Sequence, residues 1–327
     1  MWLSPSLLLM MFSIVTSIIL TISSPSLFIA WVGLELNTLA FIPLLLIKKI
    51  KLTSESSVKY FLTQTLASII IILGGLLILI FKEEMSILFI MFGLAIKLGA
   101  APFHSWIISV AESLPWVSLF FLLTIQKINP LLMVWNFSQS NSLVYFLISI
   151  CSLITGALMG LTQTSIRALI TFSSINHVGW LLISLYHDLL LGMLYFFIYT
   201  IILAVPICMF HLSSISHINQ LPLTNLKASS NLIIFFSLLS LGGLPPFLGF
   251  LPKWAVLQSC MLSGSFVMSI LMVVLSLFTL FYYLRLMFSA FIFGGMKLWS
   301  LSFFSFPWMF NILFSLSVGG LFLAYFI

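Results

Sequence analysis

Long apolar runs, each about as long as a helix that crosses a bilayer, follow one another along almost the whole chain. Only 6% of the 327 residues are charged, 62% are apolar, and the mean hydropathy is +1.29. A soluble domain of this size needs a polar coat, which 12 Lys/Arg and 6 Asp/Glu residues cannot supply. The runs also lack the alternation typical of outer-membrane barrels. The sequence therefore predicts an all-α polytopic membrane protein.

With a span length of about 20 apolar residues, the sequence predicts about eleven transmembrane helices in a single transmembrane domain, residues 1–327. The first 22 residues contain no Lys or Arg, unlike a signal or transit peptide, so the first run is expected to be a retained span. The predicted spans are 3–22, 27–47, 58–81, 86–110, 116–135, 142–160, 166–186, 189–212, 232–260, 266–293 and 303–327.

The basic residues fall mainly on one side of this map. With the N-terminus inside, the outer side receives Lys82. The inner side receives Lys48, Lys49, Lys51, Lys59, Arg167, Lys227, Arg285 and Lys297. Lys and Arg in short loops favour the inner face of a membrane. The distribution thus predicts an inside N-terminus and, after an odd number of spans, an outside C-terminus.

Four ionisable residues remain deep inside the predicted spans: Glu35, Lys97, Lys127 and Lys253. Each would cost at least about 2.5–3.5 kcal/mol at the centre of a lone lipid-facing helix. A structural ion pair with snorkelling lysines is one interpretation. Three lysines cannot all pair with one carboxylate, however, so the excess of buried bases favours water, proton exchange or an anionic partner.

Two predicted spans carry helix-breaking residues at the same spacing. Gly99 and Pro102 recur 144 residues later as Gly243 and Pro246, the latter preceded by Pro245. The charge map runs these spans in opposite directions, which predicts inverted repeats with broken helices along an ion path. A Pro kink with a packing role alone is the alternative. The repeats are expected at about 1–137 and 142–293, followed by an extra C-terminal helix at about 303–327.

The sequence offers little for other chemistry. Cys151, Cys208 and Cys260 lie far apart in apolar runs, so we expect no disulfide, metal site or iron–sulfur cluster. A Gly-rich nucleotide loop and a haem ligand pair are also lacking, which predicts no redox centre or cofactor in this chain. The basic residues are too scattered to predict a nucleic-acid partner.

Six sequence motifs resemble, in order, the chain 2 family of mitochondrial NADH:ubiquinone oxidoreductase (respiratory complex I), with an arthropod-like character. They are GLELN at 33–37, VKYFLTQ at 58–64, IKLGAAPFH at 96–104, QKINP at 126–130, FSSINHVGW at 172–180 and SLGGLPPFLGFLPKW at 240–254. The resemblance implies an antiporter-like, proton-translocating core subunit of the membrane arm, with two inverted five-helix repeats. It implies that the complex couples NADH-to-ubiquinone electron transfer to proton pumping.

The resemblance also implies roles for the four buried residues: Glu35 as the acidic partner, Lys97 as the pumping lysine, Lys127 as the connecting lysine and Lys253 on the exit side. We expect Glu35 and Lys97 to form a switchable pair, since a nearby carboxylate favours the charged form of a buried lysine. Lys127 and Lys253 are expected to meet near the repeat boundary, through water or polar side chains such as Ser173, Ser174 or His177.

Other properties follow from the resemblance alone. NADH, FMN, iron–sulfur clusters and ubiquinone would be bound by other subunits. The partners would be chains 4 and 4L, supernumerary subunits and phospholipids such as cardiolipin. The location would be the mitochondrial inner membrane, with the N-terminus in the matrix and the C-terminus in the intermembrane space. Eleven helices would match an animal form that lacks three helices, so lipid or another subunit should fill the vacated groove.

Two histidines are candidate relay sites. His104 follows Lys97 by seven residues, although Pro102 intervenes, and His177 follows two serines. For His177 a structural role is an equal alternative. Two other functions stay open for the chain as a whole. A stand-alone cation/proton antiporter usually binds cations through carboxylates, and a non-pumping scaffold subunit would use its lysines to pair with lipid phosphates or neighbouring chains.

Overall fold

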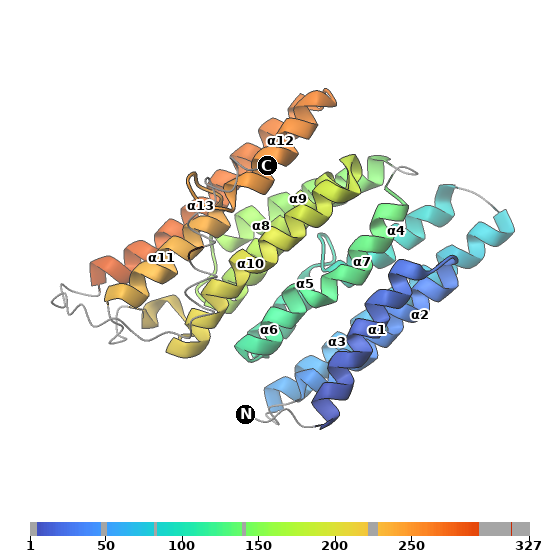
Figure 1. The fold of residues 1–327 in the computed structure, drawn as a ribbon, viewed down its shortest axis with the longest axis horizontal. Helices are drawn as coiled ribbons and strands as arrows, with labels where there is room; N and C mark the ends of the chain where they lie inside the picture. The colour runs from blue at the N-terminus through green and yellow to red at the C-terminus, as the bar shows by residue number, and fades with distance from the viewer. Residues whose placement is uncertain are drawn as a thin grey trace. The chain divides into compact units, whose positions relative to one another are not determined.

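The computed structural model describes residues 5–46, 51–81, 84–138, 142–221, 228–293 and 315. Apart from an isolated bridge between Ser165 and His217, these residues form helices and short connections (Figure 1). The helices are α1 (Pro5–Ser23), α2 (Leu27–Leu45), α3 (Lys51–Phe81), α4 (Glu84–Leu98), α5 (Ser105–Ser113), α6 (Trp116–Leu123), α7 (Ile125–Asn136), α8 (Ser142–Gly160), α9 (Ile166–His187), α10 (Leu189–Ser213), η1 (Ile218–Gln220), α11 (Ala228–Gly242), α12 (Phe250–Leu262) and α13 (Phe266–Phe293). The all-helical prediction is confirmed for this part of the chain.

The chain forms two compact units, Met1–Ser152 and Leu153–Ile327, whose boundary falls within α8. In the first unit α1 lies beside α2 (Figure 1), α3 packs along α4, and α7 contacts α1, α2 and α4. Asn129 of α7 bonds to two α1 side chains, since its Nδ2 donates to Ser17 Oγ (3.2 Å) and its Oδ1 accepts from Thr21 Oγ1 (3.3 Å). Helices α1, α2 and α4, which come earlier in the sequence, thus help to hold α7 in place.

In the second unit α9 is buried along its length. Helix α10 packs against α9, α11 and α12, and α13 packs against α11 and α12. Arg285 of α13 donates to the backbone oxygens of Leu161 and Gln163, the latter at 2.9 Å. These bonds tie α13 to the turn that follows α8.

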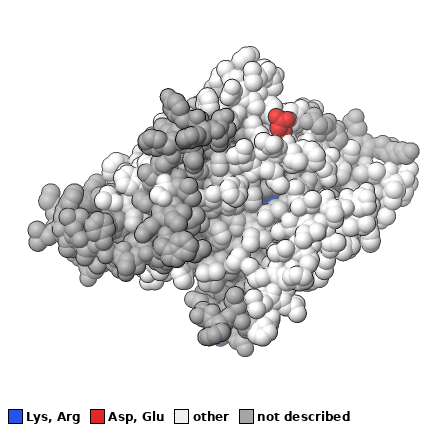
Figure 2. All heavy atoms as spheres, in the orientation of Figure 1, with Lys and Arg blue, Asp and Glu red and all other residues white. Residues whose placement is uncertain are grey.

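Among the residues that the structure describes, seven helical segments are long and apolar enough to cross a membrane: Leu27–Leu45, Lys51–Ile80, Trp116–Asn136, Leu143–Gly160, Ile166–His187, Leu189–Ser213 and Phe266–Phe288. Three shorter apolar helices are Leu7–Ser23, Met85–Leu98 and Leu232–Gly242. On the face shown in Figure 2, charged side chains take up little of the described surface. The chain is a multi-pass membrane protein, and the count of eleven spans stays a prediction.

Three predicted spans differ from single helices. The span at 86–110 consists of α4 and α5, and the span at 232–260 consists of α11 and α12, as the predicted breaks require. The span at 116–135 is interrupted at Thr124, which sequence analysis did not predict. The predicted C-terminal helix at 303–327 lies outside the described residues except for position 315. The repeat boundaries at 1–137 and 142–293 stay a prediction.

Candidate functional site

The two Gly-Pro segments interrupt their helices in the same way. Helix α4 ends one residue before Gly99, and α11 ends one residue before Gly243. Both glycines have left-handed backbones, with φ of 67° and 77°, which glycine adopts without a steric penalty. The peptide bonds Ala101-Pro102 and Pro245-Pro246 are both cis. These are full interruptions, with a non-helical connection before the next helix, rather than kinks in a continuous helix.

Side chains and local turns satisfy backbone carbonyls at both interruptions. At the first, Trp106 Nε1 donates to the Ile96 carbonyl (2.9 Å), which also accepts from the Gly99 N–H (3.0 Å). At the second, Lys253 Nζ donates to the Gly242 carbonyl (2.9 Å). Backbone groups inside a membrane protein need such partners, because lipid offers none. A lysine side chain therefore donates to a backbone carbonyl at the second interruption, whereas the Trp106 indole does so at the first.

Glu35 of α2 and Lys97 of α4 form an ion pair, with 3.1 Å between Oε1 and Nζ. The Lys97 side chain is 1% exposed and that of Glu35 is 20% exposed. Lys97 lies in the last turn of α4, where the helix dipole also favours a cation. The predicted pairing of these two residues is present, and the lysine is the more deeply buried partner.

A small cavity of about 10 Å³ within the first unit is lined by both Lys97 and Lys127. Its polar lining also includes Asn37, Thr38, Tyr60, Gln64 and Gln126. Polar lining of this kind is what a buried water requires, because water needs two to four hydrogen-bond partners. Lys97 and Lys127 therefore border the same small, partly polar space.

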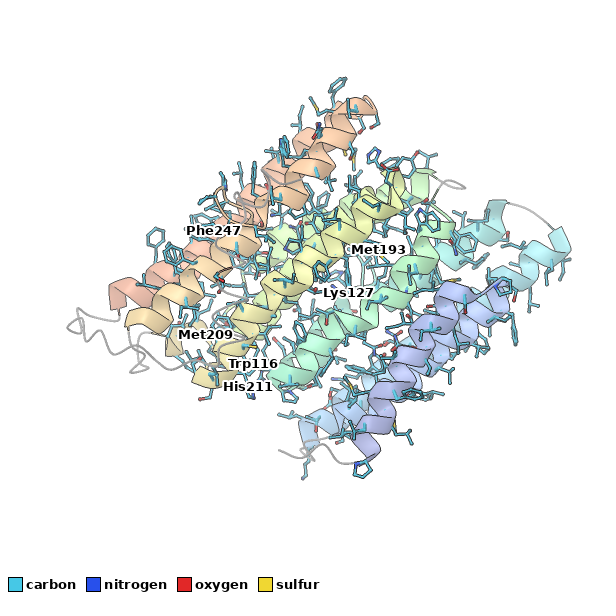
Figure 3. The ribbon with its side chains drawn as sticks, in the orientation of Figure 1. Trp116, Lys127, Met193, Met209, His211 and Phe247 are labelled. Atoms are coloured by element: carbon cyan, nitrogen blue, oxygen red, sulfur yellow. The ribbon has the colours of Figure 1, made fainter. Side chains whose placement is uncertain are left out.

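Hydrogen bonds order one part of this lining. Tyr60 donates its hydroxyl proton to Gln126 Oε1 (2.9 Å), and Gln126 Nε2 donates to Asn37 Oδ1 (3.1 Å). The bonds connect α3, α7 and α2, which carries Glu35. Lys127 follows Gln126 in the first turn of α7 and is buried (Figure 3). The interruption at Thr124 thus places this lysine at the start of a helix.

Lys253 lies in the first turn of α12, after the second interruption, and is also buried. Its Nζ lies 5.6 Å from the ring centroid of Trp180 in α9. Phe247, labelled in Figure 3, belongs to the connection between α11 and α12. The three predicted lysines are therefore all buried beside an interruption of a helix.

The two candidate relay histidines have different surroundings. His104 immediately precedes α5, is partly exposed, and has Nδ1 3.1 Å from the Pro102 carbonyl oxygen. Because α4 ends before it, the spacing of seven residues from Lys97 does not place both side chains on one helix face. His177 is buried, with Nδ1 2.9 Å from the Tyr195 hydroxyl. A role as a proton relay stays a prediction for both histidines.

Sequence analysis did not single out Tyr60, Gln126, Asn37 or Trp180. All four lie within the motifs that carry the family resemblance, which was the available signal. In the described ranges, no three His, Cys, Asp or Glu side chains gather as a metal site would require.

The fold and the buried lysines define a class of membrane transport proteins. Residues 24–279 match the family model described as NADH:quinone oxidoreductase/Mrp antiporter, transmembrane. NADH-ubiquinone oxidoreductase chain 2 of Anopheles gambiae is 43% identical over 290 residues, which are 85% of this chain and 84% of that one. The mouse (Mus musculus) chain 2 is 37% identical over 87% of this chain and 86% of its own length. The chain belongs to the NADH-ubiquinone oxidoreductase chain 2 family.

Solved structures share the fold. A chain of respiratory complex I from Thermus thermophilus, solved with bound aureothin, has a TM-score of 0.82 and 22% identity, covering 98% of this chain and 77% of that one. A chain of the Mrp complex from Dietzia sp. has a TM-score of 0.78 and 18% identity over 86% of this chain. This chain spans 60% of the length of that Mrp chain. At these identities the likeness is one of fold alone.

Proposed function

We propose that this chain is an antiporter-like, proton-translocating core subunit of the membrane arm of NADH:ubiquinone oxidoreductase. The complex would couple electron transfer from NADH to ubiquinone to proton pumping. The observation that carries the proposal is the buried ion pair of Glu35 and Lys97 beside a polar cavity that reaches Lys127. A purely structural ion pair would need no such cavity.

The pair supplies a means of loading and unloading a proton. With Glu35 ionised and 3.1 Å away, Lys97 is held as an ammonium ion. If Glu35 moves away or becomes protonated, the buried ammonium loses its counter-charge and is destabilised. Lys97 then releases a proton to water in the cavity, and neutral Lys127 is the base that accepts it. Each transfer moves one proton and leaves Lys97 neutral until it is reloaded.

We further propose that Lys127 passes the charge change to Lys253, from which the proton leaves. His104 and His177 remain candidate relay sites along the way. The expected orientation is N-terminus in the matrix and C-terminus in the intermembrane space of the mitochondrial inner membrane. Lys253 would then be the residue that releases the proton. The pair of Glu35 and Lys97 would respond to the neighbouring subunit that supplies the energy for pumping.

The remaining parts of the reaction would belong to other subunits of respiratory complex I. These subunits would bind NADH, FMN, iron–sulfur clusters and ubiquinone. Chains 4 and 4L are the proposed neighbours in the membrane arm, with supernumerary subunits on the outside. Phospholipids such as cardiolipin, or another subunit, would fill the groove expected from the three missing helices.

Two alternatives have less support. A scaffold subunit would direct its lysines to lipid phosphates or neighbouring chains, yet the Lys97 side chain is 1% exposed and faces Glu35. A stand-alone cation/proton antiporter shares the fold, but its cation site would need more carboxylates than Glu35. The pumping subunit accounts for both the burial and the pairing.

The test is proton translocation by the intact complex in phospholipid vesicles, measured together with NADH oxidation. Lys97→Met is expected to lower the number of protons moved per NADH oxidised. Lys59→Met is the matched control, because Lys59 pairs with Glu55 (2.5 Å) but is 48% exposed. An unchanged proton ratio in Lys97→Met would overturn the proposal.

A further inference from the structure

In the described part of the chain, Lys253 contacts neutral groups rather than a carboxylate. Its Nζ donates to the Gly242 carbonyl (2.9 Å) and lies over the Trp180 ring, 5.6 Å from the centroid. Within the part of the chain that the structure describes, the ion pairs within 4.0 Å are made by Lys59 and Lys97. Lys253 is 5% exposed, so these neutral contacts have to stabilise a buried cation.

The Gly242 carbonyl is well suited to that task. Gly242 is the last residue of α11, where backbone carbonyls lack partners within the helix and the helix dipole favours a positive charge. An ammonium group has three N–H donors. One donates to Gly242, which leaves two for water or for an incoming proton acceptor. Lys253 can therefore exchange a proton while it stays anchored.

Trp180 offers the ammonium group a second neutral contact. A cation within about 6 Å of an indole face is attracted by the ring quadrupole, most strongly when both groups are desolvated. Trp180 is fully buried, and the Tyr195 ring stacks on it with 6.4 Å between centroids and 15° between planes. His177 in turn contacts the Tyr195 hydroxyl at 2.9 Å. These contacts keep the indole plane in place, and the ring face takes no proton from the lysine.

Gly243 leaves the space through which Lys253 reaches this position. A Cβ atom on Gly243 would lie 2.8 Å from Lys253 Cδ and 3.1 Å from Nζ, so the lysine side chain would have to shift from this position. The aligned Gly99 has a similar φ of 67°, but a Cβ there would meet Ile107 at 3.0 Å. The two interruptions thus share a backbone geometry, and only the second uses its glycine to admit a lysine.

We infer that Gly243 and Trp180 are positioning residues that hold the Lys253 ammonium against the end of α11. Together with the Gly242 carbonyl they form a neutral cradle, in which Lys253 carries a charge without a carboxylate partner among the described residues. Glu35 supplies that partner to Lys97, so the two lysines are stabilised by different means. The inference rests on the proposed function, because it assigns these residues to the exit-side lysine.

The first experiment compares two glycines with the same backbone conformation. Gly243 and Gly264 both have φ of 77°, but nothing lies within 4 Å of a Cβ placed on Gly264. Gly264→Ala therefore adds backbone strain alone, whereas Gly243→Ala also displaces Lys253. In the intact complex in phospholipid vesicles, Gly243→Ala is expected to lose most of the proton translocation per NADH that Lys253→Met loses, and Gly264→Ala to keep it. Equal losses of proton translocation in Gly243→Ala and Gly264→Ala would overturn the inference that Gly243 positions Lys253.

The second experiment compares Trp180→Phe with Trp180→Leu. Both substitutions shorten the side chain, but phenylalanine keeps an aromatic face and leucine does not. We expect Trp180→Phe to retain most of the proton translocation per NADH and Trp180→Leu to lose most of it. Equal retention in the two variants would contradict a role for the ring face. The two Trp180 variants also test the inference if the complex with Gly243→Ala does not assemble.

The reference variant separates the two levels of the proposal. If Lys253→Met translocates protons normally, the proposed function of Lys253 itself is wrong. If Lys253→Met loses translocation while Gly243→Ala and Trp180→Leu both behave like the unaltered complex, the cradle is wrong and the function stands.

Discussion

Lys97 Nζ lies 3.1 Å from Glu35 Oε1, yet the lysine side chain is 1% exposed and the carboxylate side chain 20%. The charge on Lys97 therefore depends on Glu35 more than the charge on Glu35 depends on Lys97, since a partly exposed carboxylate can be hydrated. From this asymmetry we expect the carboxylate to control the charge of the lysine, as the proposed mechanism requires.

Glu35→Gln should lower proton translocation per NADH while leaving electron transfer measurable. The neutral amide no longer stabilises the Lys97 ammonium, so the lysine cannot be loaded as before. The measurement is the ratio of protons moved to NADH oxidised in vesicles. Glu55→Gln is the matched control, because its pair with Lys59 is exposed and worth about 0–1 kcal/mol. A normal ratio in Glu35→Gln would count against a switching role.

Lys127→Met should abolish the share of proton translocation that depends on Lys97. The cavity beside Lys97 then lacks the second base, Lys127, that would accept the proton. Lys127→Arg should not restore it, since a guanidinium keeps its charge and cannot release a proton at physiological pH. Both variants are compared by proton uptake under steady NADH oxidation. Full activity in Lys127→Arg would mean that Lys127 supplies a fixed charge rather than a transferable proton.

Tyr60→Phe should destabilise the first unit by about 1–3 kcal/mol, because it leaves the buried Gln126 Oε1 without its hydroxyl donor. The ring contacts with Phe41 and Trp106 are kept, with centroid distances of 5.4 and 5.9 Å. Thermal unfolding of the purified complex measures the change. In the double variant Tyr60→Phe with Gln126→Leu, the effects should be less than additive. Strict additivity would show that the two side chains act independently.

Arg285→Lys should lower thermal stability without changing proton translocation per NADH. A lysine cannot reproduce the two donors that the guanidinium directs to Leu161 and Gln163, and a lost hydrogen bond to a charged group costs about 1.5–3 kcal/mol. Unfolding temperature and vesicle pumping are measured on the same preparation. A reduced proton ratio at unchanged stability would assign Arg285 a functional role instead.

The broad fold and the places where helices break could be predicted because they depend on local properties. A run of about 20 apolar residues is stable as a helix in lipid whatever its neighbours are. Gly99 and Gly243 adopt left-handed backbones that other residues avoid, and Pro102 and Pro246 cannot donate a helical hydrogen bond. No glycine or proline lies at the interruption at Thr124, so the local sequence did not predict it.

The sequence by itself determined the class of protein, the helical architecture, and the four ionisable residues that a membrane protein must account for. Tertiary structure alone decided which groups face them. Glu35 and Lys97 are 62 positions apart, and Tyr60 and Gln126 are 66 apart, so only the rotation and packing of their helices bring the atoms together. The same holds for the two glycine interruptions: Gly99 faces Ile107 and Gly243 faces Lys253, because side-chain surroundings are set by neighbouring helices and not by the local motif.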